Sequence, residues 1–298
     1  MYPSSSHLVW RASISSGVLA LSLVLGLTAC AQPAAAPASR SVVVAQAESA
    51  RTREGVDVGR NSAFAKLIQP DEIEAAATKQ YGEMMRAAAS QKALAPPDNA
   101  QLQRLRRIAQ RIIPFTDEWN PRAKQWKWEV NLLGSKQINA FCMPGGKIAF
   151  YTGILEQLKL TDDEVAQVMG HEIAHALREH ARARMGKGAA TNIGASIVSQ
   201  VLGLGDLGRT VAGYGVELIS LKFSRDDEIE ADLVGLELAA RAGYDPRAGV
   251  TLWKKMQAAN KGAPPQWLST HPAGNTRITE IEKALPLVLP LYERAPKG

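Results

Sequence analysis

Two histidines and a glutamate fall within one five-residue segment, His171-Glu172-Ile173-Ala174-His175. On a helix, residues four apart lie on one face, so the rings of His171 and His175 can point at the same metal ion. Glu172 lies about 100° further round such a helix, where its carboxylate reaches a water at the metal rather than the metal itself. The segment therefore predicts a helix that holds a catalytic metal ion.

The flanking residues favour a single helix over residues 161–185. Thr161-Asp162-Asp163-Glu164 is a capping box, and apolar residues then recur at roughly helical spacing through to Arg184. His180 follows His171 by nine residues and falls on another face of this helix, which favours a structural role for it.

A catalytic zinc ion usually takes three protein ligands and leaves the fourth position for water, so a third ligand is expected downstream. Glu228 is the best candidate, because it lies in the first turn of a helix predicted over 224–243, with Ser224 as N-cap. Asp232 lies on the same face, where it can accept the ring N–H of a ligating histidine. An acidic first turn also complements the helix dipole, so composition alone does not choose among Asp226, Asp227, Glu228, Glu230 and Asp232.

Four motifs carry a resemblance to a known family. They are Asn139-Ala140-Phe141-Cys142-Met143-Pro144-Gly145-Gly146, His171-Glu172-x-x-His175, Glu228-x-x-x-Asp232, and Ser269-Thr270-His271-Pro272 with Arg277. Over roughly residues 60–285 the chain resembles the CAAX-prenyl-endopeptidase-like zinc metallopeptidases, peptidase family forty-eight, which include the HtpX-like and BepA-like gluzincins. The resemblance implies that His171, His175 and Glu228 bind one zinc ion, that Glu172 is the general base, and that Asp232 supports a ligating histidine. Cys142 departs from the residue expected before Met143-Pro144.

The resemblance also gives His271 two candidate roles. The Thr-His-Pro loop of the family lies close to the metal, so His271 could be a regulatory fourth ligand or a hydrogen-bond donor to the developing oxyanion. A histidine that only caps a loop before Pro272 is the alternative. Arg277 could hold this loop or bind a substrate carbonyl, and a surface salt bridge explains it equally well.

The remaining pattern predicts a mainly α fold with a small β-sheet, of the α+β class. Within a metallopeptidase domain over 62–285, we expect a helical lead-in (62–115), a small sheet (125–152), the histidine helix (161–185), an apolar lid-like hairpin (186–222), the Glu228 helix (224–243), and C-terminal helices with the His271 loop (245–285). The sheet would offer an extended peptide an edge to pair with, although an ordinary hairpin explains the same two β-prone runs, 128–132 and 147–151.

Residues 186–222 are strongly apolar, but glycines and charged residues interrupt them. Because no uninterrupted span of about twenty apolar residues exists there, a transmembrane pair is not expected. The segment favours a helical hairpin over the active site, mobile as a lid or touching the membrane surface, with simple core packing as the alternative.

The N-terminus predicts export. An apolar run over about 14–27, behind Arg11, is typical of a cleaved signal peptide covering residues 1–29. Leu27-Thr28-Ala29-Cys30 resembles a bacterial lipobox, which would make Cys30 the lipidated first residue. Ala31 in the next position implies the outer membrane of a Gram-negative cell, and a secreted form without lipid is the alternative.

Composition agrees with this placement. Residues 30–61, rich in Ala, Pro and Ser, favour a flexible tether, and 286–298 are expected to be a tail. With Cys30 lipidated, Cys142 has no partner, so no disulfide is expected. The net charge of +6 is modest, and there is no nucleic-acid motif and no Gly-rich phosphate loop.

The sequence therefore predicts a periplasmic, lipid-anchored zinc metalloendopeptidase of the EC 3.4.24 type, with one Zn²⁺ per chain. Its expected partners are protein or peptide substrates, with misassembled outer-membrane proteins as candidates in protein quality control, and the membrane through the lipid anchor. Nucleic acid is not expected. A chaperone or assembly factor for outer-membrane proteins, with a latent zinc site, is the alternative, and a zinc hydrolase with a non-peptide substrate is a weaker one.

Overall fold

A computed structural model describes residues 54–190, 218, 221–259, 266–272 and 274–297. The predicted signal peptide, Cys30, the tether up to residue 53, and residues 191–217 and 219–220 of the predicted lid lie outside these residues. In chain order the described elements are η1 (Ala63–Leu67), α1 (Pro70–Ser90), α2 (Ala100–Ile112), η2 (Ile113–Phe115), η3 (Pro121–Gln125), β1 (Glu129–Leu133), β2 (Ala140–Met143), β3 (Lys147–Tyr151), α3 (Thr152–Leu158), α4 (Asp162–Leu177), α5 (His180–Ala190), α8 (Arg225–Arg241), α9 (Ala248–Ala259), α10 (Gln266–Thr270) and α11 (Asn275–Arg294).

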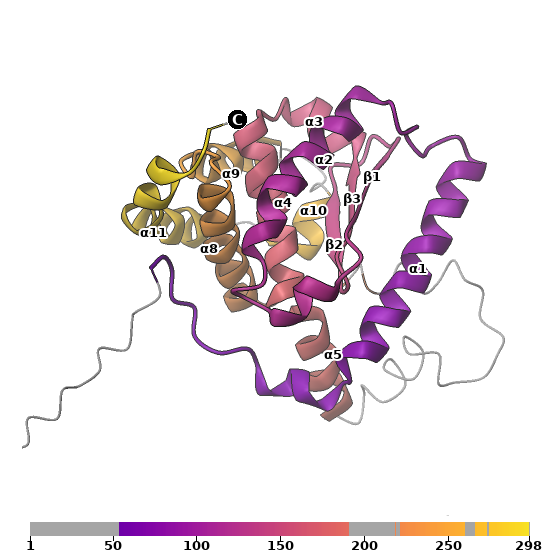
Figure 1. The fold of residues 1–298 in the computed structure, drawn as a ribbon, viewed down its shortest axis with the longest axis horizontal. Helices are drawn as coiled ribbons and strands as arrows, with labels where there is room; N and C mark the ends of the chain where they lie inside the picture. The colour runs from indigo at the N-terminus through magenta and orange to yellow at the C-terminus, as the bar shows by residue number, and fades with distance from the viewer. Residues whose placement is uncertain (1–53, 191–217, 219–220, 260–265, 273, 298) are drawn as a thin grey trace, which may run out of the picture. The chain divides into compact units, whose positions relative to one another are not determined.

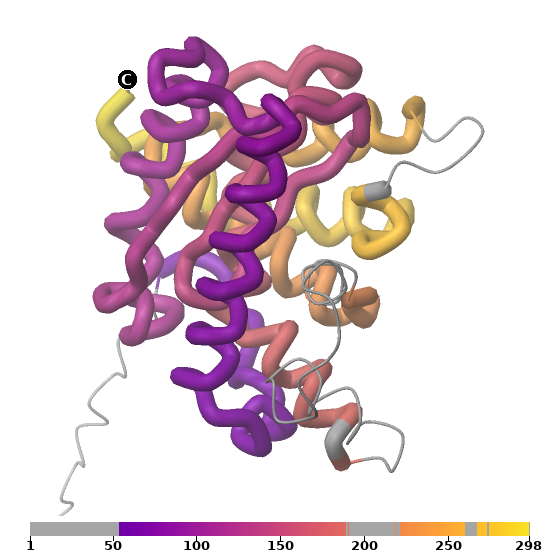
Figure 2. The backbone as a smooth tube through the Cα atoms, turned by 90° about the vertical axis from the view of Figure 1, so that its right-hand side faces the viewer, coloured from indigo at the N-terminus to yellow at the C-terminus, as the bar shows by residue number. Residues whose placement is uncertain are grey.

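Helices cover both faces of the small sheet (Figure 1). α1 packs across β2 and β3 on one face, where Figure 2 shows it crossing in front of the strands, and α2 and α4 pack on the other. Alternate side chains divide accordingly: Ile148 and Phe150 enter the larger core with α2 and α4, and Ala149 enters the smaller core with α1. The predicted mainly helical fold with a small sheet is confirmed.

The sheet has three strands in the order β1-β3-β2. β1 runs parallel to β3, with Glu129 opposite Lys147, so the two runs recognised in the sequence do not form a hairpin with each other. The hairpin joins β2 to β3, antiparallel, through a turn in which Gly145 and Gly146 have φ of 81° and 77°. No described strand pairs with the other edge of β2.

The predicted single helix over 161–185 is wrong. α4 begins as expected, with Thr161 and Glu164 forming the capping box, but it ends at Leu177 and α5 begins at His180. Between them Glu179 has φ of 57°, a left-handed conformation that is uncommon for a residue with a side chain. Distant contacts hold the break: Arg178 pairs with Glu230 of α8 and donates to the carbonyl of Gly59 at 2.9 Å.

α8 has the predicted limits. Ser224 and Asp227 form a reciprocal capping box at its start, and Gly243, with φ of 80°, follows its end. α8 crosses α4 where two glycines meet: a Cβ on Gly170 would lie 2.6 Å from the carbonyl oxygen of Gly235, and one on Gly235 would lie 2.5 Å from the backbone nitrogen of His171. Only glycines allow the two helices to approach so closely.

The C-terminal helices differ in their limits from the prediction. The first of them, α9, begins at Ala248 rather than at residue 245, and α10 occupies part of the predicted His271 loop. α11 does not end at 285 but continues to Arg294, with Pro286 and Pro290 inside it. Val288 and Leu291 are buried and extend its apolar stripe, so packing maintains the helix past the prolines.

In the described part of the chain, no helix is both long and apolar enough to cross a membrane.

Candidate metal centre

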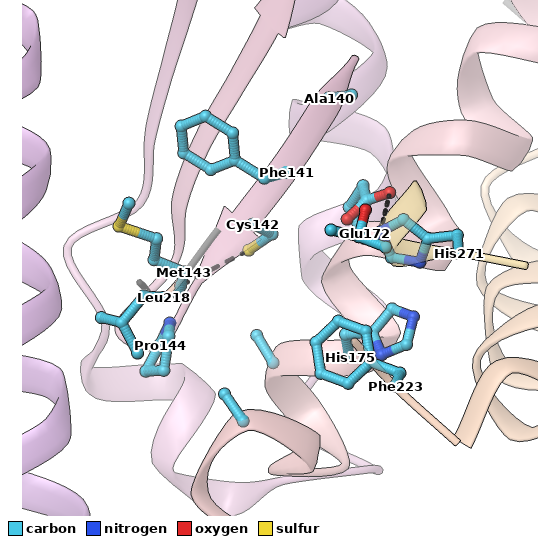
Figure 3. A pocket seen from close by; sticks show the side chains of 13 residues that line it. Ala140, Phe141, Cys142, Met143, Pro144, Glu172, His175, Leu218, Phe223 and His271 are labelled. Carbon is cyan, nitrogen blue, oxygen red and sulfur yellow. Dashed lines mark hydrogen bonds and ion pairs between the residues drawn. The ribbon is translucent and has the colours of Figure 1, made fainter. Parts of the chain in front are cut away.

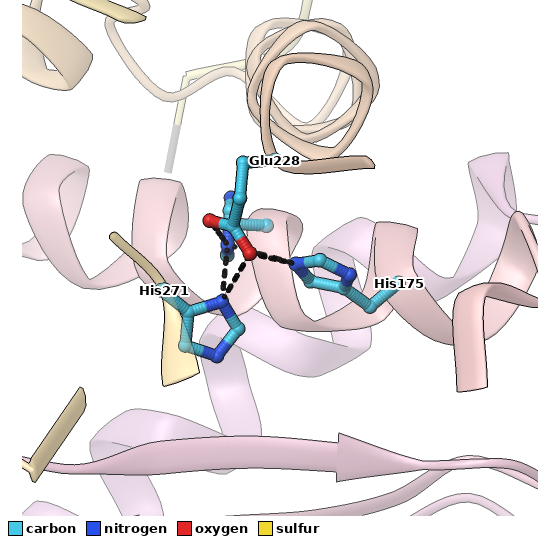
Figure 4. A group of neighbouring side chains, drawn as sticks. His175, Glu228 and His271 are labelled. Carbon is cyan, nitrogen blue, oxygen red and sulfur yellow. Dashed lines mark hydrogen bonds and ion pairs between the residues drawn. The ribbon is translucent and has the colours of Figure 1, made fainter. Parts of the chain in front are cut away.

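Four side chains of the types that bind metals converge in the interior from three segments. His171 and His175 come from α4, Glu228 from the first turn of α8, and His271 directly follows α10. One donor atom of each lies within 4.8 Å of the others, and all four residues are buried. His171 Nε2 lies 3.1 Å from His175 Nε2 and 3.2 Å from His271 Nδ1, which in turn lies 3.0 Å from Glu228 Oε1 (Figure 4).

The pKa shifts of His175 and Glu228 suit a metal ion. Burial lowers the pKa of His175 well below its ordinary value, and the neighbouring His171 adds to the effect, so the ring stays neutral and keeps a lone pair. Burial opposes ionisation of Glu228, but His271 and Arg277 outweigh it and hold its pKa below the ordinary value. Neutral imidazoles with a carboxylate form the nitrogen and oxygen donor set that zinc takes in proteins. These residues therefore fit a zinc ion.

Asp232 and Arg277 form hydrogen bonds with members of the cluster. Asp232 Oδ1 lies 3.0 Å from His171 Nδ1, the nitrogen that faces away from the other donors. Arg277 donates to the two Asp232 oxygens at 2.6 and 2.7 Å and also to Glu228. Its guanidinium lies 3.7 Å from the centre of the Trp253 ring. Because Arg277 is only 4% exposed, the surface-salt-bridge explanation is wrong, and its bond to the carbonyl of Pro272 places it against the His271 loop.

The other acidic residues of α8 have different partners. Asp227 caps the helix through the backbone N–H of Ser224, and Glu230 pairs with Arg178. Asp226 is exposed. The structure therefore brings Glu228, and not Asp226, Asp227 or Glu230, to the Nε2 atoms of His171 and His175, a choice that spacing alone left open.

Glu172 is buried beside the cluster and accepts a hydrogen bond of 2.7 Å from Nε1 of Trp267. Sequence reasoning did not single out Trp267, because nothing local connects it to a residue 95 positions earlier. His271 lies on the same turn: its backbone nitrogen donates to the carbonyl of Trp267, and the two rings are 5.0 Å apart.

A mainly apolar pocket opens beside these residues (Figure 3). Its walls include the whole of β2, Pro144, Leu218 and Phe223, with Glu172, His175 and His271. Cys142 lines it as a free thiol, and burial, with Glu172 adding, raises its pKa well above the ordinary value. The pocket joins the edge of β2 to the candidate metal centre, so an extended peptide along β2 would pass over it.

The prediction that His180 lies on another face assumed an unbroken helix. Because the helix is interrupted at Glu179, His180 instead lies against His175, with their Nδ1 atoms 2.8 Å apart. Phe223 covers a face of the His175 ring at 4.0 Å.

A helix with two histidines, a second helix with a facing glutamate, and a strand edge alongside define a metallopeptidase. The sequence profile of Peptidase family M48 matches residues 99–285, more than half of the chain, and the chain belongs to this family.

Curated relatives share the same region. The chain is 41% identical over 160 residues to the mitochondrial metalloendopeptidase OMA1 of Arabidopsis thaliana, covering 53% of this chain and 31% of that protein. It is 32% identical over 186 residues to the human mitochondrial metalloendopeptidase OMA1, covering 58% and 35%. It is 32% identical over 161 residues to the beta-barrel assembly-enhancing protease of Escherichia coli, covering 50% and 32%. The matches therefore span only about a third of the length of each of these relatives.

Proposed function

We propose that this protein is a zinc-dependent endopeptidase in which His171, His175 and Glu228 bind the zinc ion. The observation that supports this most is the convergence of three histidine nitrogens and one carboxylate at a buried point that borders an apolar pocket. Zinc bound there would acidify a water molecule and polarise a peptide carbonyl.

The chain's own groups supply the remaining chemistry. Glu172 would take a proton from the attacking water and pass it to the leaving amine. Asp232 would hold the ring of His171 through its Nδ1–H, so that Nε2 presents its lone pair to the other donors. The open edge of β2 would pair with the substrate main chain, which allows cleavage of proteins with varied side chains.

His271 would keep the centre closed at rest. Its Nδ1 lies among the other donors, at 3.2 Å from His171 Nε2 and 3.0 Å from Glu228 Oε1. This position favours a regulatory fourth ligand over a donor to the oxyanion.

We place the protein in the bacterial envelope, lipid-anchored through Cys30 to the outer membrane, where it would degrade misassembled outer-membrane proteins. The lipobox-like Leu27-Thr28-Ala29-Cys30 and the relative named beta-barrel assembly-enhancing protease support this placement. Other relatives are named as mitochondrial proteins, so the location in the envelope calls for a direct test. An assembly factor with a latent zinc site is the second candidate, because His271 closes the donor cluster.

The enzymatic proposal is tested with casein and two variants of the full chain. Hydrolysis should stop with a metal chelator and return with zinc. Glu172→Gln should lower hydrolysis by roughly 10²–10⁴-fold while zinc content and fold are unchanged. Undiminished hydrolysis by Glu172→Gln would overturn the mechanism. Exposed Asp226→Asn on α8 serves as the matched control and should keep full activity.

The same Glu172→Gln protein tests the cellular role. Expressed in its native envelope, it should trap outer-membrane proteins, and the lipid should be found on Cys30. If Glu172→Gln instead supports assembly of its clients as well as the wild type does, the assembly-factor role is favoured.

A further inference from the structure

His175 has a neighbour that the mechanism above does not use. The imidazole of His180 lies against it, with Nδ1 2.8 Å from Nδ1 of His175 and the ring centres 4.9 Å apart. Both side chains are 4% exposed. The contact is on the side of the His175 ring opposite to Nε2, the atom that faces His171 and Glu228.

The contact depends on the break between α4 and α5. In a continuous helix, a residue five positions later lies about 140° round the axis and cannot meet the first side chain. Glu179, with φ of 57°, turns the chain so that His180 comes back against His175. A residue with a side chain is rarely held in this conformation, and such positions cluster at functional sites. Arg182 pairs with the Glu179 carboxylate and holds the turn in place.

The direction of the hydrogen bond follows from metal binding. A histidine that binds a metal through Nε2 carries its proton on Nδ1. His175 Nδ1–H must therefore donate, and His180 Nδ1 must accept. This fixes the proton of His180 on Nε2, the nitrogen that faces α8.

Carboxylates of α8 lie beyond that second nitrogen. Glu230 Oε2 lies 3.6 Å from His180 Nε2, and Asp227 Oδ1 lies 3.9 Å from it. His180 Nε2 is buried and has no hydrogen-bond partner among the described residues. Arg178, from the same break, pairs with Glu230 and keeps that carboxylate beside the ring.

We propose that His180 is a positioning residue for the metal centre. It accepts the Nδ1–H of His175 and fixes that ring's tautomer and orientation, and the carboxylate of Glu230 lies beside its other nitrogen. His171 receives the same support from Asp232 directly, so each α4 histidine has its own outer partner. The inference rests on the metal centre proposed above.

Zinc affinity of the full chain tests the proposal, measured as Zn²⁺ competition against a chromophoric chelator. His180→Leu removes the acceptor and should weaken zinc binding about 10–100-fold. His180→Asn places an amide oxygen near the position of Nδ1 and should restore most of the affinity. The Co²⁺ absorption spectrum should shift in His180→Leu and stay close to the wild type in His180→Asn.

A control separates positioning from general stability. Met185→Ala removes a buried side chain of α5 that belongs to the smaller core, so it should lower the Tm and leave zinc affinity unchanged. Glu230→Gln should weaken zinc binding less than His180→Leu does. If His180→Leu does not fold, the zinc affinity of Glu230→Gln is the measurement that tests the proposal.

Equal zinc affinity in wild type and His180→Leu, or equal losses in His180→Asn and His180→Leu, would overturn the positioning role alone. Failure of the wild type to bind zinc would overturn the metal centre itself.

Discussion

The indole N–H of Trp267 donates a hydrogen bond of 2.7 Å to Oε1 of Glu172, and both side chains are buried. His271 follows Trp267 by one turn and lies among the candidate metal-binding side chains. The short helix α10 therefore brings two groups to the candidate centre together, one to the proposed general base and one to the donor cluster. Movement of α10 would release both.

His271→Ala should raise casein hydrolysis by about tenfold. When a side chain holds the centre closed, only the open fraction of molecules is active, and removing that side chain increases this fraction. The measurement is kcat/KM at equal zinc occupancy. A fall of roughly 10²–10³-fold instead would identify His271 as a donor to the oxyanion.

Trp267→Phe should also raise hydrolysis, by less than His271→Ala. Phenylalanine can keep the stacking on Trp253 but cannot donate to Glu172, so the closed position of α10 is weakened. Because both residues act through one helix, the double variant should gain less than the two single gains combined. If the increase in the double variant equals the product of the two single increases, Trp267 and His271 do not act through one closing movement.

Arg277→Met should lower the free energy of unfolding by about 3–5 kcal/mol in the presence of a chelator, because it leaves Asp232 and Glu228 buried without their cation. Arg277→Lys should recover only part of the lost free energy of unfolding. A single ammonium group cannot reproduce the planar guanidinium, whose N–H groups contact both carboxylates. Chemical denaturation measures the differences. A loss below about 1 kcal/mol, the range of surface pairs, would contradict this account.

Lys255→Met should destabilise the protein by about 1 kcal/mol at pH 7. Burial works against the charge of Glu164, but Lys255 and the Thr161 N–H outweigh it and hold the pKa of Glu164 below its ordinary value. A lowered carboxyl pKa contributes stability above the unfolded-state pKa, and this stability is lost as the pH falls through the folded-state pKa. The difference between wild type and Lys255→Met should therefore shrink below about pH 4.5, the ordinary value for Glu164. Denaturation curves from pH 7 to pH 3 test this, and a difference independent of pH would exclude it.

Local features of the structure followed from the sequence. The capping boxes at Thr161 and Ser224 and the glycine after α8 are signals carried within one helical turn, so the starts of α4 and α8 were predicted. The four-residue spacing of His171 and His175 required only that α4 be a helix. The hairpin partner of β3 was not predicted, because β2 has only four residues and is too short to give a clear alternation.

By itself, the sequence determined which chemical groups the site would contain, since metal-binding residue types and helical spacing are local properties. Only the tertiary structure decided how they meet. The Gly170–Gly235 crossing brings Glu228 to the histidines, and the Arg178–Glu230 pair helps to hold the break that turns His180 onto His175. The glycine crossing and the Arg178–Glu230 pair join residues 52 or more positions apart, and their geometry depends on how whole helices pack, which no local pattern encodes.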